Sequence, residues 1–255
     1  MLSHSERDEF EHSGLLRLRG AVPDREIATM RDRFWEALAT DHGIARDRPD
    51  TWTVERPRHL QALKRSGAFN LMATAEVRAA LDDLLGASGW NRPKTWGLPL
   101  VTFPAPGSPW NVPPAGWHVD SYGPDHELPG VTVFVFLEPV APGGGGTVVL
   151  RRSHHLFNRH IATAGTCGPA EVKAALGSSH PWLRDLWGAD AQPGRVVRYL
   201  EHGATVDGVD LRVQELTGSP GDVVLMHPRT LHAPAPNSLG TPRMMLVEII
   251  NRGRE

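Results

Sequence analysis

The sequence predicts a mainly β fold with flanking helices, of the double-sheet jelly-roll type. Helical periodicity marks the first 93 residues, whereas short runs rich in Val, Thr, Phe and Leu, bounded by Pro and Gly, predominate from residue 94 onward. About eight strands after about three helices suit such a fold. We therefore expect a single domain over 1–255, with a helical flank and a first strand in 1–93 and the jelly-roll core in 94–255.

Capping signals bound the three predicted helices. Ser3 and Glu6 have the spacing of a capping box, which predicts a helix over 3–12. The other two helices are expected from Pro23 to Gly43 and from Thr74 to Gly86, where apolar residues recur at helical spacing. These amphipathic helices should pack on the core.

The strands are predicted from β-rich runs and their flanking turn residues. They are expected at 15–18, 95–103, 116–119, 131–137, 147–151, 196–201, 209–215, 223–227 and 244–250. Asp207-Gly208 predicts a hairpin turn. Residues 155–192 form a partly helical insertion, which is either a lid or a stably packed excursion.

Composition excludes several classes of protein. Lys and Arg number 27 against 29 Asp and Glu, for a net charge of -2, which argues against nucleic-acid binding. No apolar run is long enough to span a membrane, and the single cysteine, Cys167, excludes a disulfide framework. We expect a cytoplasmic protein, monomeric or homodimeric, that acts on a small molecule.

A His-x-Asp sequence is the first candidate metal site. Residues 116–120 read Gly-Trp-His-Val-Asp, and strand alternation would place His118 and Asp120 on one face. With 13 histidines in the chain, however, roughly 0.8 such pairs are expected by chance. The spacing alone therefore decides nothing.

A second group of residues, far downstream, makes the His-x-Asp pair part of a more specific pattern. Residues 221–232 read Gly-Asp-Val-Val-Leu-Met-His-Pro-Arg-Thr-Leu-His, and Arg243 follows eleven residues later. Together with the Gly-rich stretch 143–154 and the opening 10–31, this order resembles the phytanoyl-CoA dioxygenase family of iron(II)/2-oxoglutarate oxygenases. The resemblance implies a double-stranded β-helix, the cupin-like form of the jelly roll.

The resemblance also implies roles for individual residues. His118, Asp120 and His232 would be the metal ligands and the catalytic centre, and Arg243 would pair with the distal carboxylate of 2-oxoglutarate. Two imidazoles and a carboxylate suit iron(II), leaving positions for 2-oxoglutarate and dioxygen. The guanidinium fork of Arg243 suits a carboxylate.

The chain departs from the family pattern at two places. Arg152 stands where the family usually has Gly before Ser-His, and Pro234 stands two residues after His232, where the family often has a hydroxyl. Proline cannot donate a hydrogen bond from a side chain. The candidate replacements for that donor are Thr230, Thr147 and Thr132.

The predicted activity is hydroxylation of a small organic substrate, with release of succinate and carbon dioxide. Desaturation, cyclisation or epimerisation by the same metal site is the alternative within enzymes. A non-catalytic jelly-roll binding protein is the alternative outside them, although such a protein needs neither the triad nor Arg243. The four-glycine run is expected to be a tight turn, because it lacks the context of a phosphate-binding loop.

Overall fold

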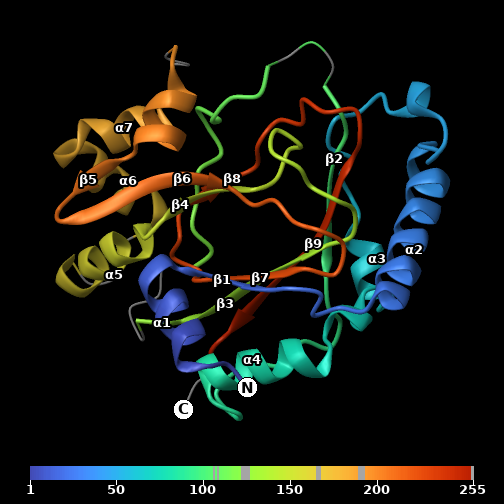
Figure 1. Cartoon of the computed structure of the whole chain (residues 1–255), viewed down its shortest axis with the longest axis horizontal. Helices are drawn as coiled ribbons and strands as arrows, with labels where there is room; N and C mark the ends of the chain where they lie inside the picture. The colour runs from blue at the N-terminus through green and yellow to red at the C-terminus, as the bar shows by residue number, and fades with distance from the viewer. Residues whose placement is uncertain (106, 108, 122–126, 165–167, 189–192, 254–255) are drawn as a thin grey trace.

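The computed structural model describes residues 1–105, 107, 109–121, 127–164, 168–188 and 193–253 (Figure 1). Its α-helices are α1 (His4–Ser13), α2 (Asp24–His42), α3 (Gln61–Arg65), α4 (Ala75–Leu85), α5 (Ser153–Ala164), α6 (Pro169–Ser179) and α7 (Pro181–Trp187). Shorter turns are η1 (Pro49–Thr51) and η2 (Asn70–Met72), and η3 (Val196–His202) is a π-helix. Within these residues, no helix combines the length and apolar character needed to span a membrane.

The strands form two antiparallel sheets. They are β1 (Leu15–Leu18), β2 (Leu98–Thr102), β3 (Gly130–Phe136), β4 (Val148–Arg151), β5 (Ala204–Val206), β6 (Val209–Glu215), β7 (Val223–Met226), β8 (His232–Ala233) and β9 (Arg243–Asn251). The larger sheet has the order β1-β7-β3-β9-β2, and the smaller one β5-β6-β4-β8. More of the described residues lie in helices than in strands, so antiparallel sheets with helices describe the fold better than mainly β.

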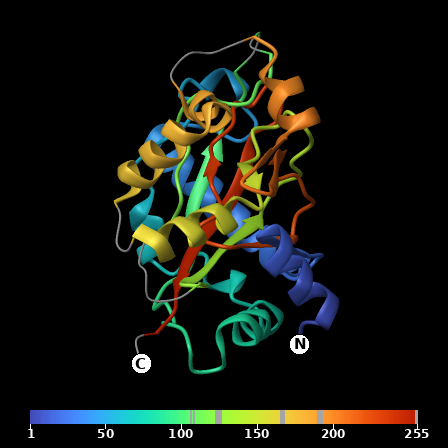
Figure 2. The same ribbon diagram turned by 90° about the vertical axis from the view of Figure 1, so that its left-hand side faces the viewer.

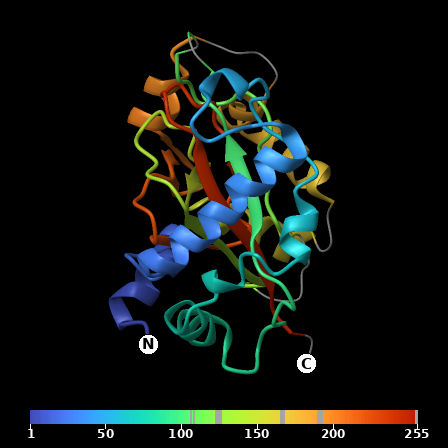
Figure 3. The same ribbon diagram turned by 90° about the vertical axis from the view of Figure 1, so that its right-hand side faces the viewer.

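Apolar residues separate the molecule into layers. One cluster joins the helical flank to the outer face of the larger sheet. A second lies between the sheets and groups Phe134 and Met245 of the larger sheet with Val149 of the smaller one. A third joins the smaller sheet to α5, α6 and α7. Figure 2 shows these insertion helices in front of the sheets, and Figure 3 shows α2 crossing the opposite side.

The insertion is a packed layer. Val172 of α6 and Leu183 and Leu186 of α7 are buried in the same cluster as the smaller sheet. Arg195, 1% exposed, donates to the carbonyls of Asp185 and Leu186 and to those of Val112 and Pro113. The guanidinium thus ties α7 to the segment that leads to His118, which favours the packed excursion over the lid. Cys167 lies outside the described residues.

The predicted caps are confirmed, and one predicted strand is wrong. Ser3 and Glu6 form the capping box of α1, Thr74 caps α4, and Gly43 ends α2 in the left-handed conformation. Residues 196–201, in contrast, lie in the π-helix η3. Their apolar run resembles a strand locally, but Tyr199 is buried against Trp182 of α7 and the flanking Arg195 bonds to the carbonyls of Val112 and Pro113, so tertiary contacts determine the conformation.

Three histidines join α1, α5 and β7. His154 lies between His155 and His227, with ring centroids 4.0 and 4.7 Å away, and its Nε2 bonds to the carbonyl of Glu11. Burial lowers the pKa of His154 to about 4 and the pKa of His227 to about 3. Both rings are therefore neutral at pH 7.

These shifts predict how stability depends on pH. Above the unfolded pKa of about 6.5 their contribution is fully present, and it is lost as the pH falls toward the folded value, because only the unfolded chain takes up the proton. Each histidine should contribute a slope of about 1.4 kcal/mol per pH unit in that window.

His154→Gln, which keeps an N–H donor for Glu11, should flatten the decline in unfolding free energy between about pH 7 and about pH 5. Urea unfolding of the metal-free wild type and variant at both pH values measures this difference. Identical declines in the two proteins would show that His154 is not held neutral.

Candidate metal centre

The site begins with a direct pairing of two histidines. His118 and His232 form an isolated antiparallel bridge, in which each backbone N–H donates to the other residue's carbonyl at 2.9 Å. Their ring centroids lie 4.1 Å apart. His232 opens β8, which pairs with β4 through Val149. The predicted strand at 116–119 is thus reduced to one bridge, but its alternation is preserved, because Trp117 and Val119 face the opposite way into the core.

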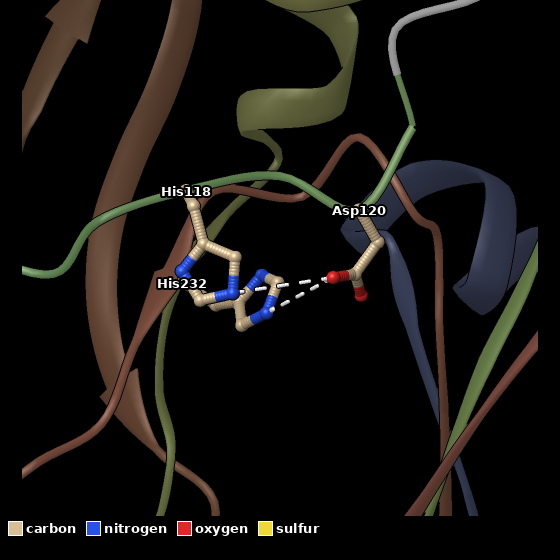
Figure 4. A group of neighbouring side chains, drawn as sticks. All are labelled: His118, Asp120 and His232. Atoms are coloured by element: carbon tan, nitrogen blue, oxygen red, sulfur yellow. Dashed lines mark ion pairs between the residues drawn. The ribbon is translucent and has the colours of Figure 1, made fainter.

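Asp120 joins this pair from the same side of the segment. Its Oδ1 lies 3.7 Å from Nε2 of His232 and 4.0 Å from Nε2 of His118 (Figure 4). The backbone N–H of Asp120 donates to Pro228, which holds the segment against the loop before β8. Among the described residues, these three side chains are the one group of three or more His, Cys, Asp or Glu placed to share a metal ion.

Hydrogen bonds orient the three ligand atoms. Nδ1 of His118 lies 2.8 Å from the carbonyl of Gly116, and Nδ1 of His232 lies 3.0 Å from that of Thr230. Since a carbonyl only accepts, each Nδ1 carries the proton and each Nε2 keeps its lone pair. The hydroxyl of Thr132 donates to Oδ2 of Asp120 at 2.7 Å, which leaves Oδ1 facing the imidazoles.

Burial differs across the site. The side chains of His232 and Asp120 are 7% and 10% exposed, whereas His118 is 51% exposed, so the site opens to solvent on the His118 side. Burial lowers the pKa of His232 to about 4, with the Asp120 carboxylate opposing the shift. A neutral imidazole is the form that binds a metal.

Arg243 brings a buried positive charge to the space between the sheets. It shares a face of β9 with Met245, is 4% exposed, and donates from Nε to the carbonyl of Gly145. Its Nη1 has no hydrogen-bond partner, and no carboxylate forms an ion pair with it, within the described residues. Burial lowers the pKa of Arg243 to about 10, so the group remains charged at pH 7.

The glycine run forms the tight turn expected before β4. Gly145 has φ +79°, and a Cβ there would lie 2.8 Å from the Cβ of Asn237. The N–H groups of Gly143 and Gly146 donate to the buried carboxylate of Glu215. This turn directs the carbonyl of Gly145 toward Arg243.

The predicted threonines lie in different places. Thr132 contacts Asp120, and Thr230 lies against the backbone of Gly14, at 3.5 Å from its carbonyl. Thr147 is buried between the glycine turn and the first residue of β4. Sequence reasoning missed Thr102, whose buried hydroxyl is unpartnered in the described structure and whose neighbour across the sheet is Arg243. Nothing local in the sequence marks this threonine.

Comparisons with known proteins bear on the family and on the fold. The model of the family described as phytanoyl-CoA dioxygenase matches residues 10–245. No curated protein matches the sequence.

Several solved structures share the fold. HygX from Streptomyces hygroscopicus, with nickel and 2-oxoglutarate bound, is 16% identical with a TM-score of 0.57, and the match covers 98% of this chain and 87% of HygX. EctD from S. alaskensis, with 2-oxoglutarate and 5-hydroxyectoine, is 17% identical with a TM-score of 0.58, and the match covers 98% of this chain and 76% of EctD. The epimerase SnoN from nogalamycin biosynthesis is 16% identical with a TM-score of 0.56, and the match covers 97% of this chain and 79% of SnoN.

The orientation of Asp120 predicts a measurable effect of Thr132. Thr132→Val should weaken binding of a divalent ion such as Mn²⁺ by about 10- to 100-fold, because the carboxylate loses the donor that fixes it. Titration calorimetry of the metal-free protein gives the affinity. Thr205→Val is the matched control, since it removes an exposed threonine hydroxyl that also donates to an aspartate, Asp210. Equal metal affinity in wild type and Thr132→Val would contradict the assigned role.

Proposed function

The chain belongs to the phytanoyl-CoA dioxygenase family, and we propose that it is an iron(II)- and 2-oxoglutarate-dependent oxygenase that hydroxylates a small organic molecule. The other products would be succinate and carbon dioxide. The observation that carries this proposal is the convergence of His118, Asp120 and His232 on one point. The sequence predicts a 2-oxoglutarate-dependent non-haem iron dioxygenase, which is the enzyme class of this family.

The donor atoms fit iron(II). Two neutral imidazole nitrogens and one carboxylate oxygen form the ligand set typical of non-haem iron oxygenases, in which three further positions stay open. We assign Nε2 of His118, Nε2 of His232 and Oδ1 of Asp120 as the ligands. When bound, iron(II) would supply the centre at which dioxygen is activated while 2-oxoglutarate is oxidised. Thr132 would hold Asp120 in position for this set.

Arg243 fits the distal carboxylate of 2-oxoglutarate. A buried guanidinium without a carboxylate partner is costly, and a bound anion would remove that cost. Arg56 adds positive potential, since its charge contributes to lowering the pKa of Arg243. Thr147 remains a proposed second contact to the keto acid, because it faces the space between the sheets on the same side of its strand as Val149.

The substrate would approach from the exposed side of His118. We propose a small organic molecule, as the structural relatives' names indicate for those proteins. SnoN is named an epimerase and SnoK a carbocyclase, so one fold accommodates different outcomes. For this chain we propose hydroxylation, which needs one substrate C–H bond placed at the metal and neither a second reacting group nor a separate hydrogen donor.

Arg243→Lys should weaken 2-oxoglutarate binding by about 1 to 3 kcal/mol, because lysine keeps the charge but loses the two-pronged geometry. Anaerobic titration of the iron(II)-loaded protein, followed by the visible charge-transfer band of the keto-acid chelate, gives the affinity. Metal binding itself should not change. An unchanged keto-acid affinity would assign the anchor to another residue.

Asp120→Ala should abolish succinate formation from 2-oxoglutarate under air, because the metal loses its anionic ligand. The assay follows succinate by mass spectrometry with iron(II) present, and treatment of the wild type with a chelator should give the same loss. Thr205→Val should form succinate at the wild-type rate. Sustained succinate formation by Asp120→Ala would overturn the ligand assignment.

A further inference from the structure

Thr102 and Arg243 are direct neighbours across the larger sheet. Thr102 ends β2 and Arg243 begins β9, and the register pairs them. Paired residues of antiparallel strands have Cβ atoms about 4.5 to 5.5 Å apart and share a face. That face is the one between the sheets, because Leu100 and Met245, each two residues away, both contribute to the apolar cluster there.

Both side chains carry a buried polar atom without a partner. Thr102 is 0% exposed, and its Oγ1 makes no hydrogen bond within the described residues; the same holds for Nη1 of Arg243. The main chain of Thr102 is well satisfied, since its carbonyl accepts from Nδ2 of Asn237 at 3.0 Å. The unsatisfied hydrogen-bonding capacity of this pair thus lies in the side chains. An unpartnered buried polar group destabilises a fold, so two on adjacent strands point to a ligand that both of them contact.

The charge around the pair selects an anion. Arg243 contributes a buried positive charge, and Arg56, which pairs with Glu55 at 3.1 Å, lies near enough to act on the pKa of Arg243. Glu215 is the acidic group that acts on Arg243, but its carboxylate already accepts from Gly143 and Gly146. A hydroxyl beside a guanidinium can donate to the oxygen of a carboxylate that the guanidinium also binds.

We propose that Thr102 is a cosubstrate-binding residue, whose hydroxyl donates to the distal carboxylate of 2-oxoglutarate beside Arg243. This inference rests on the proposed function. It explains how the chain tolerates Pro234, which offers no hydroxyl two residues after His232. Thr132 already donates to Asp120, and Thr230 lies against Gly14. Thr102 would act beside the proposed contact from Thr147, and it lies on an edge strand, β2, which precedes all three proposed metal ligands in the chain.

A pair of keto acids tests this assignment. 2-Oxoglutarate and 2-oxopentanoate have the same chain length, but the second lacks the distal carboxylate. In anaerobic titrations of the iron(II)-loaded protein, Thr102→Val should raise the dissociation constant of 2-oxoglutarate by about 10- to 100-fold, as for a lost hydrogen bond to a charged group. The dissociation constant of 2-oxopentanoate should stay the same. Thr102→Ser, which restores the hydroxyl, should recover most of the affinity for 2-oxoglutarate.

Two further variants keep the test decisive. Thr102→Ala also lacks the hydroxyl but is smaller than valine, so the measurement can proceed with whichever variant folds, as judged by its thermal unfolding and Mn²⁺ affinity. Thr205→Val is again the matched control and should bind both keto acids as the wild type does. Equal binding of 2-oxoglutarate by the wild type and both hydroxyl-free variants would overturn the role of Thr102 alone. Failure of the wild type to bind 2-oxoglutarate would instead overturn the proposed function.

Discussion

The backbone pairing of His118 with His232 is the constraint on which the site depends. These residues lie 114 positions apart in the sequence, and their two reciprocal backbone hydrogen bonds bring them side by side, so that the ring hydrogen bonds need only orient the imidazoles. Alternation along the first segment then places Asp120 on the same side, and the core behind Trp117 and Val119 fixes which side that is. The layers of sheet and helix serve to hold this one pairing in register.

Local signals predicted the elements that depend on local interactions. The capping box of Ser3 and Glu6, the Thr74 cap and the Gly43 terminus are all properties of a few neighbouring residues. The hairpin at Asp207-Gly208 is equally local, since both residues adopt positive φ between β5 and β6. The π-helix η3 is not, because it depends on contacts of Arg195 and Tyr199 with distant segments. A propensity reading of 196–201 therefore selects the wrong conformation.

The site also has one part that the sequence predicted and another that only the structure reveals. The order of His118, Asp120, His232 and Arg243 was visible in the sequence only through the family pattern, and the match over residues 10–245 shows the family. The structure adds the convergence of His118, Asp120 and His232. The hydrogen bond of Thr132 to Asp120 and the pairing of Thr102 with Arg243 depend on strand register, which no local sequence signal gives. Arg152 illustrates the reverse case: it adopts φ +66°, so the turn keeps the backbone conformation suited to glycine although the residue has changed.

The unpaired charge of Arg243 also has a meaning for the protein without ligand. An apolar side chain of similar volume would pack more favourably between the sheets, since burying a lone guanidinium costs more than its single hydrogen bond to Gly145 returns. The resting fold thus carries a local destabilisation, as is common where recognition and stability compete for one position. Under the proposed function, 2-oxoglutarate would relieve it, and the cosubstrate would act as a thermodynamic stabiliser of the native state as well as a reactant.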